Sequence, residues 1–288
     1  GYTSAEQSSL KICYNQLDNY VKLLRDAMNT PSSRFSQFAA GEEGNYQQLS
    51  RNIIQIENEL YSPIRPKQPT LSMEKPTDAL VRRGISYIEV RALDVNPFSA
   101  IGISQTQFDF LDVFLVSCLL MPSPELDETQ LKEAKENMNK VVLEGRSPEL
   151  LLQNGGEDIS LSNWCTSLFS SFEQAAELLD LANDTSRYSQ AVKTEFEKVQ
   201  NPELTPSGKL LSTLIESDKD NGVLGLELAQ AYQAEMKSFE YTDTDAEGFA
   251  AQAETSFAAQ KEIEAADTKD FDTFIREYFA EPPAKKNA

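Results

Sequence analysis

From residue 104 to residue 266 the sequence is a succession of helix-patterned segments, and this pattern limits the fold more than any other feature. Apolar residues recur at helical spacing within each segment, and breaks rich in Pro, Gly or Asp separate one segment from the next. The segments are 104–121, 127–145, 160–183, 185–200, 206–217, 225–241 and 246–266. We therefore expect residues 104–288 to form a helical region.

The first third of the chain contains two segments with the period of two that is typical of β-strands. Apolar and polar residues alternate in 52–61 and again in 85–93. In the second segment this alternation places Glu89 and Arg91 on one face of the strand. We expect residues 1–103 to form a sheet domain, so the fold class is α+β and predominantly helical.

Shorter signals complete the pattern of the first third. A helix should begin near Asp18 and stop before Pro31, and a second helix should span 77–83 and end at Gly84. Pro63, Pro66 and Pro69 predict irregular structure directly after the first strand.

The composition excludes several classes of protein and site. The 288 residues include no histidine, which removes His-based triads and most zinc sites. Cys13, Cys118 and Cys165 form no close pair, so a reducing cytoplasm fits better than a disulfide framework. The net charge of −20 disfavours nucleic-acid partners.

The sequence also gives no indication of a membrane partner. Its most apolar run, 108–121, contains Asp109 and Asp112 and is too short to cross a bilayer. We expect this run to be a buried core helix.

The segment from Tyr61 to Arg91 is basic within this acidic chain. It contains six basic residues and only three acidic ones, a local charge of +3. Guanidinium and ammonium groups hold phosphate and carboxylate ligands, so an anion site is one interpretation. Scattered surface charge is the other.

Glu89 and Arg91 lie two residues apart on one strand face, about 7 Å from one another. A lone carboxylate there could bind a hard cation such as Mg²⁺ while the guanidinium contacts phosphate. Alternatively, the carboxylate belongs to an ion pair of modest energy. Spacing does not decide between these alternatives, nor does it decide whether Glu57 and Glu59 form a second carboxylate pair.

Two stretches of this sequence resemble the signature of the glutamate–cysteine ligases of the proteobacterial type. The first is Gln55-Ile-Glu-Asn-Glu-Leu-Tyr-Ser-Pro-Ile-Arg-Pro-Lys67, and the second is Gly84-Ile-Ser-Tyr-Ile-Glu-Val-Arg-Ala-Leu-Asp-Val-Asn-Pro-Phe-Ser99. Looser matches lie at 1–3, 142–146 and 264–267. The resemblance runs along the whole chain and corresponds to the C-terminal portion of a family member.

The resemblance implies a fold, a reaction and a set of ligands. The fold would be the C-terminal part of a glutamine-synthetase-like sheet with helices packed around it. ATP with Mg²⁺ (or Mn²⁺) would phosphorylate the γ-carboxylate of glutamate, and cysteine would then form the amide of γ-glutamylcysteine. The protein would act by positioning and charge neutralisation.

Roles for individual residues follow from the same resemblance. Glu89 matches a magnesium ligand, and Arg91 matches the catalytic arginine that contacts the transferred phosphoryl group of ATP. Tyr2 and Tyr61 match tyrosines of the cysteine pocket, and Arg65 falls where a nucleotide or phosphate contact is expected.

The resemblance also predicts an absent partner. The glutamate-rich N-terminal strand of the family is not in this sequence, so we expect the N-terminal half of the same protein to be missing and the isolated chain to be inactive. Two alternatives remain open: a related carboxylate–amine ligase that uses another amine, and a non-catalytic helical interaction module.

Overall fold

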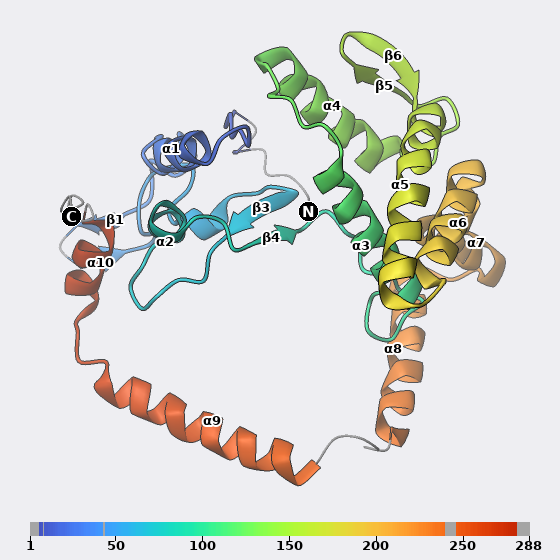
Figure 1. Cartoon of the computed structure of the whole chain (residues 1–288). Coiled ribbons are helices and arrows are strands. Elements are labelled where there is room, and N and C mark those ends of the chain that lie inside the picture. Colours follow the sequence, from blue (N-terminus) through green and yellow to red (C-terminus); the bar gives the residue numbers. More distant parts are fainter. Residues whose placement is uncertain (1–5, 8, 43, 240–245, 281–288) are drawn as a thin grey trace. The chain divides into compact units, whose positions relative to one another are not determined.

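The computed structural model describes residues 6–7, 9–42, 44–239 and 246–280 (Figure 1). The chain forms two compact units. The first comprises Gly1–Leu93 together with Tyr241–Ala288, and the second comprises Asp94–Glu240. The expected division into domains at residues 103 and 104 stays a prediction.

The first unit combines short strands with helices. Its elements are α1 (Leu17–Met28), β1 (Ala40–Glu42), β2 (Asn45–Tyr46), the 3-10 helix η1 (Glu57–Glu59), β3 (Ile64–Lys67), α2 (Pro76–Arg83), β4 (Tyr87–Val90), α9 (Ala246–Ala266) and α10 (Phe271–Phe279). Strands β1 and β2 pair antiparallel, as do β3 and β4. The predictions of α1, α2, β4 and α9 are confirmed, whereas α10 was not anticipated.

The core of the first unit forms where α1 meets η1 and α2. Helix α1 buries one stripe that consists of Tyr20, Val21, Leu24 and Ala27. Ile54, Leu60 and Leu80 complete the buried cluster. Ile54 and Leu60 flank η1 on either side, so the core anchors both ends of the segment 54–60 that contains η1.

The strand predicted for 52–61 is wrong. This segment is irregular and contains η1, although Ile54 and Leu60 are both buried. The start of the segment bonds another stretch of backbone, because the Ile53 N–H donates to the Thr30 carbonyl over 2.8 Å. Side chains bond its later backbone: the Gln55 N–H donates to Glu59 Oε2 and Arg65 Nη2 donates to the Asn58 carbonyl, each over 2.7 Å. A pattern of apolar residues does not reveal such bonds.

The prediction that the prolines after η1 exclude regular structure is wrong, because β3 forms at Ile64–Lys67. Pro66 lies inside β3 and is opposite Ile88 of β4. The Arg91 N–H donates to the Pro63 carbonyl over 2.7 Å. Bonded positions alternate along an antiparallel pair, so Pro66 falls between them and its missing N–H breaks no bond to β4.

The β3–β4 ribbon has one charged face and one apolar face. The charged face carries Arg65, Lys67, Tyr87 and Glu89, because residues directly opposite in the register share a face. The other face carries Ile64, Pro66, Ile88 and Val90. Ile88 and Val90 are 45% and 42% exposed, so this apolar face is uncovered in the first unit.

The second unit is mainly helical. It contains α3 (Gln105–Leu120), α4 (Glu128–Glu144), β5 (Leu151–Asn154), β6 (Glu157–Ser160), α5 (Leu161–Asn183), α6 (Arg187–Gln200), the 3-10 helix η2 (Pro202–Leu204), α7 (Pro206–Ser217) and α8 (Asn221–Ser238). Helices α3, α5 and α6 pack on one another around Val113, Phe169, Phe172, Tyr188 and Val192 (Figure 1). All these helices correspond to predicted segments.

Helix α3 begins at the predicted capping box, in which the Gln107 N–H donates to Ser104 Oγ over 3.2 Å. It is not the fully buried helix expected from its composition. Asp109, Val113 and Ser117 are buried along one stripe, whereas Leu119 is 83% exposed. The apolar composition of this helix therefore exceeds what its neighbours in the second unit cover.

The hairpin of β5 and β6 was not predicted. A two-residue loop joins the strands, and both Gly155 and Gly156 have positive φ, at 66° and 84°. Such a loop needs residues that tolerate positive φ, so the Gly-Gly pair was an available signal. The Asn137 amide of α4 holds β5 through two bonds to the Gln153 backbone, of 2.7 and 2.9 Å.

Candidate active site

A cavity of about 380 Å³ brings together three of the predicted site residues, namely Tyr61, Arg65 and Arg91. Its other lining residues are Asn58, Glu59, Leu60, Ser62 and Pro63. Most of its wall is thus one continuous segment, 58–63, between η1 and β3. Tyr2 lies outside the described residues.

Arg65 is a buried cation that pairs with no carboxylate among the described residues. Its residue is only 5% exposed, and its Nη2 donates to the carbonyls of Asn58, over 2.7 Å, and Leu60. Its Nε is buried and has no hydrogen-bond partner in the described part of the chain. Burial and then the neighbouring charge of Arg91 lower the pKa of the Arg65 guanidinium.

Glu89 lies on the same face of the ribbon, directly opposite Arg65 in the register. Its carboxylate pairs with Lys67 over 3.1 Å and with Arg91 Nε over 2.8 Å. The hydrogen bond from Lys67 is the largest cause that lowers the pKa of Glu89. Glu89 and Arg91 thus form the ion pair that was one interpretation of their spacing, and Arg91 also lines the cavity. The role of Glu89 as a metal ligand stays a prediction.

Tyr61 stands at the exposed side of this cavity. Its residue is 52% exposed, whereas the preceding Leu60 is buried in the core. The Tyr61 N–H donates to Oε1 of Gln7 over 2.7 Å, and Nε2 of Gln7 donates to the Glu59 carbonyl over 2.8 Å. Sequence reasoning missed Gln7, Asn58 and Ser62, although Asn58 and Ser62 lie within the first signature stretch.

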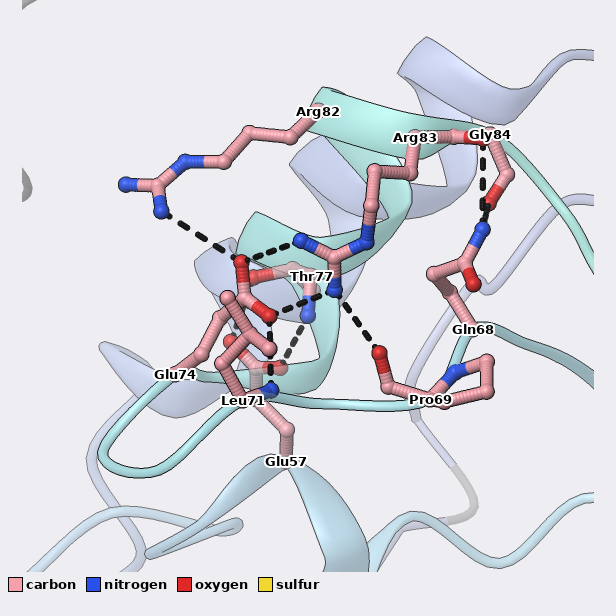
Figure 2. A network of polar contacts seen from close by, with 9 residues as sticks. All are labelled: Glu57, Gln68, Pro69, Leu71, Glu74, Thr77, Arg82, Arg83 and Gly84. Atoms are coloured by element: carbon pink, nitrogen blue, oxygen red, sulfur yellow. Dashed lines mark hydrogen bonds and ion pairs between the residues drawn. The ribbon is translucent and has the colours of Figure 1, made fainter.

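Helix α2 supports the segment 58–63 from the side of η1. Figure 2 shows Glu57, which is 3% exposed, accepting bonds from the Thr77 N–H over 2.6 Å and the Thr77 hydroxyl over 2.5 Å. The Thr77 Oγ1 also accepts a bond from Arg25 Nε over 3.1 Å. Burial raises the pKa of Glu57, and the Thr77 bonds oppose that rise. Glu57 is therefore a structural carboxylate at the start of the cavity wall.

The loop between β3 and α2 is held by a second set of ionic contacts (Figure 2). Arg83 donates to both oxygens of Glu74, over 3.0 and 2.6 Å, and Arg82 lies 3.3 Å from Glu74 Oε1. The bonds from Arg83 lower the pKa of Glu74 to about 2. These basic residues of the Tyr61–Arg91 segment are thus engaged on α2 and do not line the cavity.

A second cavity of about 510 Å³ has Glu57 of η1 in its wall. Its lining residues are Arg25, Met28, Asn29, Leu49, Ser50, Asn52, Glu57, Lys75, Asp78 and Phe279. It contains none of the predicted site residues, and its charged groups are already paired in part, as in the 2.7 Å contact of Arg25 with Asp78.

The described residues do not form a metal centre on their own. No group of three or more His, Cys, Asp or Glu side chains in the described ranges is arranged to hold an ion. Within the same ranges, no helix combines the length and the apolar character that a membrane crossing requires.

The cation-lined cavity and the α+β fold define a class once they are compared with known proteins. A solved structure of glutamate–cysteine ligase from Francisella tularensis in complex with AMP matches with a TM-score of 0.86 and 32% identity, over 96% of this chain and 54% of that chain. A bifunctional glutathione synthetase from Pasteurella multocida matches with a TM-score of 0.57 and 20% identity, which supports the fold alone. The class is that of proteins that share the fold of this glutamate–cysteine ligase.

Sequence comparisons specify the family. The model of the family described as glutamate-cysteine ligase matches residues 1–141. Glutamate–cysteine ligases from Shewanella pealeana and Vibrio vulnificus are 42% and 43% identical over 97% of this chain. Over nearly its whole length the chain is therefore similar to members of the glutamate–cysteine ligase family. It spans about half the length of these relatives, 53% and 54% respectively.

Proposed function

We propose that this chain supplies part of the active site of a cytoplasmic, ATP-dependent glutamate–cysteine ligase. The reaction joins the γ-carboxylate of L-glutamate to the amine of L-cysteine, giving γ-glutamylcysteine for glutathione. The observation that carries the proposal is the cavity beside the ribbon, where Tyr61, Arg65 and Arg91 come together. Two of these side chains are cations, which suits a reaction of phosphate and carboxylate groups.

In this reaction the γ-carboxylate attacks the terminal phosphorus of ATP, and ADP leaves with the bonding electron pair. The cysteine amine then attacks the acyl carbon, phosphate leaves, and the amine loses its proton as the amide forms. Charge builds up on phosphoryl oxygens in the first step, so fixed cations around them lower the barrier. Arg91 has this role in our proposal, and Arg65 adds positive charge from within the cavity wall.

Glu89 fits one ligand position for Mg²⁺ or Mn²⁺. Mg²⁺ sites that bind nucleotides often use one or two carboxylates together with phosphate oxygens and water, so a single carboxylate is compatible with such a site. The lowered pKa keeps Glu89 ionised, as a metal ligand must be. When bound, the ion would neutralise charge on the phosphates of ATP.

The cysteine substrate would be held by Tyr61 and Tyr2. A phenol can donate a hydrogen bond to the substrate carboxylate, and Tyr61 stands at the exposed side of the cavity. Tyr2 is assigned on the resemblance alone. Because the chain spans about half the length of its relatives, we expect further substrate contacts to come from outside it, and we expect the isolated chain to show no turnover.

A chimera tests this function. This chain would replace the matching half of the Shewanella pealeana ligase, and formation of γ-glutamylcysteine and ADP would be measured. We expect activity that Arg91→Gln lowers in kcat by about 100-fold or more, as for other residues that stabilise transition-state charge. Arg82→Gln is the matched control, since Arg82 pairs with Glu74 and does not line the cavity.

The result has three informative forms. A folded chimera without activity, or an Arg91→Gln variant as active as its parent, contradicts the proposal. Preference for another amine over cysteine would assign the chain to a related carboxylate–amine ligase. Turnover by the isolated chain would refute the need for a second portion.

A further inference from the structure

Gln7 contacts the cavity wall in a manner that resembles a neighbouring β-strand. Its side-chain amide donates to the Glu59 carbonyl over 2.8 Å and accepts from the Tyr61 N–H over 2.7 Å. An adjacent antiparallel strand would offer one donor and one acceptor to such a pair of backbone groups. The segment 59–61 has no strand partner in the described chain, so Gln7 satisfies groups that would otherwise rely on water.

Gln7 is itself held in place. The Leu10 N–H donates to the Gln7 carbonyl over 3.0 Å and closes a turn, and Leu10 packs against the core cluster. On the other side of the turn, the carboxylate of Glu6 accepts a bond from the Ser32 hydroxyl over 3.0 Å. Gln7 is thus held close to the core by its turn, and its side-chain amide bonds the backbone of residues 59 and 61.

Three groups converge on the same short segment from different directions. Leu60 is buried in the core, Arg65 binds the Leu60 carbonyl from the side of β3, and Gln7 bonds the residues on each side of Leu60. Of these anchors, only Gln7 bonds the backbone of Tyr61 directly. Its loss should leave Leu60 in the core and allow Tyr61 to rotate relative to the cavity.

We propose that Gln7 is a positioning residue, whose amide fixes the backbone of Glu59 and Tyr61 and so sets the place of the Tyr61 ring at the cavity. This inference rests on the proposed function in one respect: Tyr61 is taken to contact the cysteine substrate. The expected consequence is selective. The apparent affinity for cysteine depends on Gln7, whereas the affinity for ATP, which is assigned to the arginines, does not.

The contact itself is tested in the 288-residue chain by hydrogen exchange. Gln7→Leu keeps the approximate volume and removes both bonds, so the protection factor of the Tyr61 amide should fall about tenfold, while that of the Leu24 amide in α1 stays unchanged. Gln7→Glu keeps the acceptor for Tyr61 and loses the donor to Glu59, so protection of the Tyr61 amide should persist. Unchanged protection in Gln7→Leu would overturn the proposal.

The consequence for substrate binding is tested in the chimera described above. Gln7→Leu should raise KM for cysteine about three- to tenfold and change KM for ATP by less than about twofold. Asn137→Leu is the matched control, since it removes an amide with the same two kinds of bond on the β5–β6 hairpin. It should change neither KM.

The two proposals fail in different ways. If the unsubstituted chimera makes no γ-glutamylcysteine, the proposed function fails, and exchange at the Tyr61 amide still decides whether Gln7 fixes the segment. If the chimera is active and Gln7→Leu raises both KM values equally or neither of them, the positioning role is overturned while the ligase function stands.

Discussion

Arg65 and Glu89 lie directly opposite one another in the β3–β4 ribbon, yet they do not form an ion pair. The carboxylate of Glu89 is bound by Lys67 and Arg91, and the guanidinium of Arg65 turns to backbone carbonyls. A buried guanidinium is usually compensated by a carboxylate, because an unpaired buried charge is costly. The arrangement therefore leaves a positive charge at the cavity, which an anionic ligand would compensate.

This arrangement predicts that Glu89→Gln changes the affinity for ATP in opposite directions with and without a divalent ion. Without the ion, loss of the negative charge frees Lys67 and Arg91, and the affinity for ATP should rise about fivefold, or about 1 kcal/mol for charges near a surface. With Mg²⁺ the variant lacks a ligand, and the affinity should fall about tenfold. Titration calorimetry with ATP in EDTA and in Mg²⁺ measures both effects on the chain.

Glu203→Gln is the matched control for this experiment. It removes an equal charge from a carboxylate that pairs with Arg146 over 3.0 Å on the second unit. The control should change neither affinity by more than about twofold, because neither Glu203 nor its partner Arg146 lines the cavity. A Glu89→Gln variant that gains or loses affinity equally under both conditions would argue against Glu89 as a metal ligand.

The sequence was sufficient to predict an element where a single residue determines the local backbone structure. Helix α2 starts with Pro76 and ends at Gly84, whose φ of 74° favours glycine, and both ends follow from the sequence. Strand β4 has the alternation that was predicted, and the expected face with Glu89 and Arg91 borders the cavity through Arg91.

The sequence was insufficient where side chains replace a backbone partner. The alternation in 52–61 resembles a strand, but the side chains of Gln7, Glu59 and Arg65 bond backbone groups of this segment that a strand partner would otherwise bond. The Gln7 contacts link residues 52 and 54 positions apart, so no local pattern contains them. For the same reason the residues of the first signature stretch were predicted to form the site, whereas Gln7 was not.

Thr77→Val is expected to destabilise the first unit. Thr77 is completely buried, and its hydroxyl donates to Glu57 and accepts from Arg25. Valine has nearly the same shape but leaves both partners with one bond fewer, so the free energy of unfolding should fall by about 1–3 kcal/mol. Urea unfolding at neutral pH measures this change.

The pH dependence of the same variant follows from Glu57. Burial raises the pKa of this carboxyl, so the folded state binds the proton more tightly than the unfolded state, and that contribution to stability is lost as pH rises through the folded pKa. The Thr77 hydroxyl opposes the rise, so its removal should matter less at about pH 5 than at about pH 8. Thr77→Ser keeps the hydroxyl and should show no such dependence; an equal loss at both pH values would contradict the argument.

Glu74 should produce a loss of stability in acid. The Arg83 bonds hold the pKa of Glu74 at about 2, below its ordinary value of 4.5. The corresponding stabilisation is fully present above pH 4.5 and is lost as pH falls toward 2. Glu74→Gln should remove this part of the acid dependence of Tm, which circular dichroism follows.

Two arginine variants separate the contributions to this effect. Arg83 makes two contacts with Glu74 and Arg82 makes one longer contact, so Arg83→Gln should lower Tm at neutral pH more than Arg82→Gln does. Equal effects of the two variants, or an acid dependence that persists in Glu74→Gln, would assign the low-pH transition to other carboxylates.

The apolar face of the ribbon should make the isolated chain associate with itself. Ile88 and Val90 are nearly half exposed on a two-stranded ribbon, and an uncovered apolar face beside free strand edges favours association. The double substitution Ile88→Lys and Val90→Lys adds two like charges there. It should shift the chain toward monomer in size-exclusion chromatography with light scattering, over a range of concentrations.

A control pair and the chimera distinguish this face from general hydrophobicity. Leu143 and Leu181 are each 82% exposed on the second unit, and their substitution by Lys makes the same change in charge. It should leave the association of the chain unchanged, because these residues are not on the ribbon.

In the chimera, where the second portion of the ligase is present, we expect the ribbon face to be covered. Ile88→Lys with Val90→Lys should therefore abolish activity by disrupting that contact. Association that responds equally to both pairs, or a chimera that tolerates the ribbon substitutions, would mean that the second portion does not pack on this face.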